Sequence, residues 1–188
     1  MFRKPVPQPA APKPVVSPLE FKLRYQNRLH SGANWFFWIA ALSVINSVLM
    51  ATESSINFIF GLAATQIIDA LAYIFGQEIQ LGAINTLRII GWGLNLLIVG
   101  IFVLFGVFAH KGKRWAFYAG MVLYMLDAVA ALFVWDKPDL LSFAFHLIVI
   151  WGLAGGLRAL SQLDRLDETL RQAGLLPVEP PPSAIRPM

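Results

Sequence analysis

The chain contains no cysteine, and only 14% of its residues are charged. Without cysteine it forms no disulfide, carries no thiolate nucleophile and offers no sulfur ligand to a metal ion. Soluble domains have roughly 25% charged residues, so the low charge argues against a water-soluble fold. Two long stretches, 19–137 and 139–176, contain no proline, because all twelve prolines lie in the first 18 residues, at Pro138, or from Pro177 onward. The proline-free regions therefore suit uninterrupted helices.

Apolar sequence is what the chain has in excess: 57% of its residues are hydrophobic, and the mean hydropathy is +0.61. The apolar residues fall into five segments, 33–51, 55–75, 83–109, 115–135 and 140–157. A helix of about 20 apolar residues crosses the hydrocarbon core of a bilayer. The composition therefore predicts an all-α fold, a polytopic membrane helical bundle in which four or five of the segments span.

The flanking regions divide the chain further. Residues 1–18 and 175–188 are rich in proline, which predicts disordered tails around the transmembrane domain of 33–157. Residues 19–32 mix leucines with basic residues, typical of an interfacial amphipathic segment, and an extension of the first membrane helix fits the same pattern. Residues 158–174 keep leucines at helical spacing among charges, which predicts a cytoplasmic amphipathic helix ending at its final glycine.

Lysine and arginine indicate how the segments are threaded, because they prefer cytoplasmic loops. Six lie before residue 33, three form the cluster Lys111, Lys113 and Arg114, and four follow residue 157. If all five segments span, the first two groups lie on opposite sides of the membrane. If one of the first three segments does not cross, all three groups and both termini become cytoplasmic. We favour four spans, and a regular five-span bundle stays open as the alternative.

Segment 55–75 is the candidate for an element that enters the membrane without crossing it. It carries Asn57, Gln66 and Asp69, and only three residues connect it to the segment before. Backbone that stops at membrane depth must be surrounded by protein or by a wet cavity. We therefore expect any re-entrant element of this chain to lie here.

Three ionisable residues lie inside apolar segments, Asp69, Asp127 and His146. Such groups are costly in a membrane and count as functional-site hypotheses, although polar contacts between helices also use them as packing groups. His30 and His110 lie at segment ends, so the three or four ligands of a zinc site are not assembled and no metal or cofactor is predicted. The further polar candidates inside the segments are Gln66, Asn46 and Asn95.

Packing residues are also visible in the pattern. Gly152 and Gly156 form a GxxxG step, which permits close approach of two helices. Trp92 and Trp151 lie inside apolar segments rather than at their ends, so we expect them to pack within the bundle.

The motifs of common enzymes are absent. The sequence has no GxSxG nucleophile elbow, HExxH zinc motif, P-loop or dinucleotide-binding glycine run. No catalytic residue is therefore predicted, and an enzymatic activity has no support in the sequence.

Several short motifs carry a resemblance. They are Ser31 to Phe36, Gly61-Leu62 with Thr65 to Asp69, Lys111 to Phe117, Tyr124 with Asp127, and Phe145-His146. Through them, residues 28–162 resemble a group of small multi-pass bacterial membrane proteins to which no activity is assigned. The resemblance implies a bacterial inner-membrane setting and carries over no functional residue.

Two hypotheses of function follow. The first is a small integral inner-membrane protein with an interaction, subunit or scaffold role, whose partners are anionic lipid headgroups and a second copy or another membrane protein. The pI near 9.6 then reflects cytoplasmic loops, and no nucleic acid is involved. The expected headgroup contacts are Arg24, Arg28, Lys111, Lys113 and Arg114.

The second hypothesis is a small oligomeric transporter or channel. In it, Asp69, Asp127 and His146 bind or relay protons or cations. The two hypotheses differ in one observable: the three residues either meet at a shared site or contact neighbouring helices separately.

Overall fold

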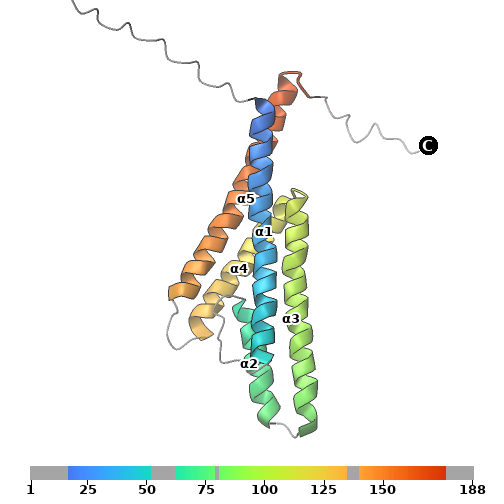
Figure 1. Cartoon of the computed structure of the whole chain (residues 1–188), viewed down its shortest axis with the longest axis vertical. Coiled ribbons are helices and arrows are strands. Elements are labelled where there is room, and N and C mark those ends of the chain that lie inside the picture. Colours follow the sequence, from blue (N-terminus) through green and yellow to red (C-terminus); the bar gives the residue numbers. More distant parts are fainter. Residues whose placement is uncertain (1–16, 52–61, 79–80, 135–139, 177–188) are drawn as a thin grey trace, which may run out of the picture.

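The computed structural model describes residues 17–51, 62–78, 81–134 and 140–176, and within the helices it leaves some side chains, Asp69 among them, undescribed. Both predicted tails, apart from their innermost residues, and positions 55–61 lie outside this part. Every element in the described part is an α-helix, which confirms the predicted all-α class (Figure 1). The helices are α1 (Pro18–Ala51), α2 (Ala63–Glu78), α3 (Leu81–His110), α4 (Arg114–Val134) and α5 (Leu140–Gln172).

Four of these helices, α1, α3, α4 and α5, are long and apolar enough to cross a membrane. Helix α2 has 16 residues and is therefore about 24 Å long at 1.5 Å per residue. The hydrocarbon core of a bilayer is roughly 30 Å thick. Helix α2, which includes most of the non-crossing candidate 55–75, is thus the shortest helix in the described part.

Helix α1 begins earlier than its apolar segment. Pro18 occupies the first helical position, and the Ser17 hydroxyl accepts the Glu20 N–H at 3.3 Å, as a helix N-cap does. The helix then continues unbroken to Ala51. Residues 19–32 are therefore continuous with the first helix, and Lys22 bonds Asp167 of α5 at 2.7 Å and holds this part against α5.

Helix α5 likewise runs past its apolar segment without a break, as the pattern of leucines and charges predicted for 158–174. It ends where Gly174 adopts a φ of +71° and the Leu175 N–H donates to the Leu170 carbonyl at 2.9 Å. This left-handed residue satisfies carbonyls at the end of the helix, and glycine adopts it without strain. The predicted stop is confirmed.

The described members of the three basic groups lie toward one end of the bundle. The His30 ring of α1 lies 5.0 Å from the His110 ring at the end of α3, and Arg114 at the start of α4 pairs with Asp164 of α5. The α3–α4 loop therefore lies beside these parts of α1 and α5, toward the end of the bundle where α1 begins and α5 ends (Figure 1). This arrangement is the one expected for a chain whose second segment does not cross.

Beyond the α3–α4 loop, α1 and α5 continue side by side (Figure 1). We call residues 17–30 and 161–172 the α1–α5 extension. Leu160 lies beside Gly112 of the loop, so the remaining twelve residues of α5 reach about 18 Å farther.

Below the extension, glycines let α1 approach α5 and α4. A side chain on Gly32 would collide with the Gly156 backbone, and one on Gly152 would collide with the Trp35 ring. The close approach expected from the GxxxG step is confirmed. The expectation that Trp92 and Trp151 pack inside is wrong, because they are 55% and 73% exposed.

Candidate functional site

Helix α2 begins in the middle of the bundle and lacks a capping residue of its own. The residue before Ala63 is Leu62, whose side chain accepts no hydrogen bond, whereas helix N-caps are usually Ser, Thr, Asp or Asn. The Leu62 N–H instead donates to the Ser43 hydroxyl of α1 at 3.0 Å, and that hydroxyl donates to the Ile39 carbonyl at 2.8 Å. The first turn of α2 is therefore satisfied by a neighbouring helix.

Asp127 of α4 supplies the main cap. The Ala63 N–H donates to its Oδ2 at 3.0 Å, and the Ala64 N–H donates to its Oδ1 at 2.9 Å. The side chain of Asp127 is 4% exposed, so water does not compete for these bonds. Backbone N–H groups and the helix dipole make a helix N-terminus favourable for an anion, and here the anion is a carboxylate of the same chain.

His146 of α5 completes the site. Its Nδ1 lies 2.8 Å from the Ser142 carbonyl one turn earlier, and its Nε2 lies 3.4 Å from Asp127 Oδ2. The Tyr124 ring stacks on the imidazole with 5.0 Å between the ring centroids. The Tyr124 hydroxyl is buried and has no hydrogen-bond partner within the described residues. Helices α1, α2, α4 and α5 thus all contribute to one buried polar site.

The structure brings only part of the predicted polar set together. Asp127 and His146 meet, whereas Asp69 lies in α2 with its side chain outside the described part. Gln66 is half-buried in α2, and Asn46 is buried in α1 one turn after Ser43. Asn95 lies away from them, between α1 and α3.

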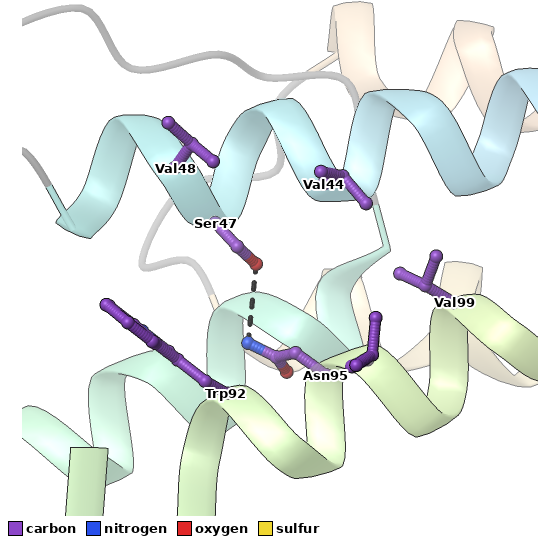
Figure 2. A pocket seen from close by; sticks show the side chains of 7 residues that line it. Val44, Ser47, Val48, Trp92, Asn95 and Val99 are labelled. Atoms are coloured by element: carbon purple, nitrogen blue, oxygen red, sulfur yellow. Dashed lines mark hydrogen bonds between the residues drawn. The ribbon is translucent and has the colours of Figure 1, made fainter. Parts of the chain in front are cut away.

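Asn95 lies on the floor of a groove between α1 and α3 (Figure 2). Its Nδ2 donates to the Ser47 hydroxyl at 3.3 Å. The groove has a volume of about 380 Å³, and its walls include Val44, Val48 and Trp92. Asn95 and Ser47 therefore form a polar contact between α1 and α3 inside an apolar groove, and neither of them lines the site at Asp127.

Two members of the site were not among the predicted candidates, Ser43 and Tyr124. Tyr124 precedes Asp127 by three residues, which places both on one face of a helix. That spacing is a usable signal in the sequence. The role of Ser43 has no such signal, because its partner Leu62 is 19 residues away and offers only a backbone N–H.

Outside the bundle core, the predicted headgroup residues are all exposed: Arg24, Arg28, Lys111, Lys113 and Arg114. In the described part of the chain, no three histidine or acidic side chains gather closely enough to hold a metal ion. Comparisons with protein-family models, with curated proteins and with solved structures gave no match. The function is therefore inferred from the residues of this chain.

Proposed function

We propose that the chain is a multi-pass protein of a bacterial inner membrane that acts by interaction, as a subunit or scaffold. The observation that carries this proposal is the α1–α5 extension, which continues past the rest of the bundle and is tied by the Lys22–Asp167 ion pair. The buried polar groups favour the same role, because Ser43, Asp127 and His146 each bond to another helix or to their own backbone.

The proposed topology has four spans, with both termini cytoplasmic and α2 re-entrant. Its support is the gathering of the basic groups at one end and the short α2, whose N-terminus is enclosed by protein as such backbone requires. The positive-inside rule then assigns the basic end to the cytoplasm.

Single-cysteine labelling checks this topology directly, because the natural chain has no cysteine. We expect Gln26→Cys, Lys113→Cys and Gln172→Cys to react with an impermeant maleimide from the cytoplasmic side of oriented membrane vesicles. Glu78→Cys, at the end of α2, should react from the opposite side. Reaction of the Gln26→Cys and Lys113→Cys variants from opposite sides would contradict the four-span arrangement, because five spans place these two positions on opposite sides.

The charges of the basic end suggest what it contacts. Across residues 17–32, 111–114 and 158–172 there are nine lysines or arginines against four acidic residues. Lys111, Lys113 and Arg114 lie at the loop, where anionic headgroups are within reach. The headgroup layer adds only some 5–8 Å on each side of the hydrocarbon core, whereas the extension continues for about 18 Å. Its outer part therefore faces water. On the α1 side of the extension, Arg24 and Arg28 are exposed on one face, and an acidic surface on a protein partner fits that face.

Photo-crosslinking in intact membranes tests the partner surface. A photoreactive residue at Asn27, which is exposed between Arg24 and Arg28 on one face of α1, should give a discrete adduct with another protein chain. Reversing the charges with Arg24→Glu and Arg28→Glu should reduce that adduct at least tenfold, because the proposed partner is acidic.

The matched control carries the photoreactive residue at Leu96, which is exposed on the apolar face of α3. It should give lipid adducts only. If position 27 also yields lipid adducts only, or if the charge reversal leaves its protein adduct unchanged, the partner surface is not where we place it.

The transporter or channel stays the alternative function, and one observation favours it. Asp127 and His146, two of the three residues it needs, are in contact at 3.4 Å. The hydrogen bonds around this contact indicate which ion it can bind.

A further inference from the structure

Both ring nitrogens of His146 make a contact, and the chemistry of the two contacts depends on which nitrogen carries a hydrogen. A backbone carbonyl can only accept a hydrogen bond. Because His146 Nδ1 lies 2.8 Å from the Ser142 carbonyl, Nδ1 must carry a hydrogen and donate it. A neutral imidazole has one N–H, so in the neutral ring Nε2 would present a bare lone pair to Asp127.

Asp127 cannot complete that contact as a simple carboxylate. Its two oxygens already accept the Ala63 and Ala64 N–H groups, and an ionised carboxylate offers acceptors only. A neutral His146 would therefore set a lone pair against a negative oxygen at 3.4 Å with water excluded. One additional hydrogen between Nε2 and Oδ2 removes this conflict.

We propose that Asp127 and His146 form a proton-binding site that holds one hydrogen ion between them, carried on His146 Nε2. The site is placed at the N-terminus of α2, and binding gives an imidazolium facing a carboxylate with no net charge. Both oxygens of the carboxylate accept backbone N–H groups, so the hydrogen is placed on the imidazole rather than on Asp127. Proton loss leaves the carboxylate as the cap of α2 and removes the attraction that holds α5 to it.

Tyr124 supports the site in two ways. Its ring covers the imidazole at 5.0 Å with 22° between the planes, and the face of an aromatic ring attracts a cation. The whole Tyr124 residue is 1% exposed, and its hydroxyl has no hydrogen-bond partner within the described residues. A hydroxyl can both donate and accept, so this group is suited to pass a proton to or from the pair through a water molecule.

Among the described side chains, the other groups around the pair are neutral. Helix α1 contributes Ser43, α2 contributes its backbone N–H groups and Thr65, and α3 contributes Phe102, whose ring packs on Tyr124. Within the described residues, no lysine or arginine forms an ion pair with Asp127. The ionisable side chains described here are thus Asp127, His146 and Tyr124, and any change in the charge of the site comes from them.

Nitrogen NMR of the histidine rings tests the proposal in the full chain. The protein is labelled with 15N-histidine and reconstituted in lipid nanodiscs, and a His30→Gln, His110→Gln double variant leaves His146 as the single histidine. At pH 7 we expect both ring nitrogens of His146 to carry hydrogen. Asp127→Asn should remove the hydrogen from Nε2 and leave the one on Nδ1, because the amide supplies no negative charge.

His110 is a matched internal control. Its Nδ1 lies 3.0 Å from the Gly106 carbonyl one turn earlier, as His146 Nδ1 does from Ser142, but the described side chains place no carboxylate at its ring. The control is measured in the His30→Gln single variant, which keeps His110, and there Asp127→Asn should leave the His110 resonances unchanged.

The outcomes separate cleanly. A bare His146 Nε2 at pH 7 in the wild-type sequence overturns the proposal, as does a His146 spectrum that Asp127→Asn does not change. If Asp127→Asn does not fold, the spectrum of the double variant with Asp127 intact still decides, because it reports directly whether Nε2 carries the hydrogen.

Discussion

Asp127→Ala is expected to lower the free energy of unfolding by about 3–5 kcal/mol, the cost of breaking a buried charged pair. The substitution removes the acceptor of two backbone N–H groups and the partner of His146 in one step. An unsatisfied buried donor alone costs about 1–3 kcal/mol. The Asp127 side chain is 4% exposed, so bulk solvent does not replace the carboxylate at these donors. Unfolding in mixed micelles of increasing SDS content, followed by helicity and tryptophan fluorescence, measures the loss.

Asp164→Ala is the control for this measurement. Asp164 also pairs with a basic side chain, Arg114, but both side chains are about half exposed. Exposed ion pairs contribute about 0–1 kcal/mol, so its loss should be several times smaller. Equal losses for the two alanine variants would mean that Asp127 does not hold α2.

Gly32→Ala is expected to cost about 3 kcal/mol, the upper end of the range for overpacked cores. The added methyl group would collide with the Gly156 Cα and come within 2.7 Å of the Gly156 nitrogen and 3.1 Å of the Gly152 oxygen. All three atoms belong to the α5 backbone, so no side chain can rotate away and α1 and α5 must separate. The same SDS titration measures the effect.

Gly155→Ala provides the contrast, one residue from Gly156 on the same helix. A methyl group there meets no atom within 4 Å, and alanine favours a helix over glycine by up to about 1 kcal/mol. This variant should be as stable as the wild type or more stable. If Gly32→Ala behaves like Gly155→Ala, the α1–α5 contact is looser than described.

The sequence predicted the helices and the grouping of the basic residues, because both depend on local features. Proline placement marks where helices can run, and the Lys111 cluster marks the loop between α3 and α4. The inner face of each helix was harder to predict. Helix α3 is apolar on nearly every side, so no polar stripe distinguishes its buried positions from its exposed ones, and Trp92 was wrongly expected to be buried.

The candidate site was predicted only in its separate parts. Asp127 and His146 stand out because ionisable residues are rare in apolar segments. Their meeting at α2 depends on how four helices pack, and no spacing within one helix reports it. The cap also binds backbone N–H groups of Ala63 and Ala64, which every residue except proline offers, so the identity of those residues gives no sign of it.

The borrowed cap of α2 also bears on the order in which the protein can be made. Ala63 and its acceptor Asp127 are 64 residues apart, so Asp127 leaves the ribosome well after Ala63. While the chain is being synthesised, α2 emerges with its first N–H groups unmet, and they need water or the insertion machinery until α4 arrives. We therefore expect α2 to settle in the membrane only after α4 has entered, so that its insertion depends on a part of the chain synthesised later.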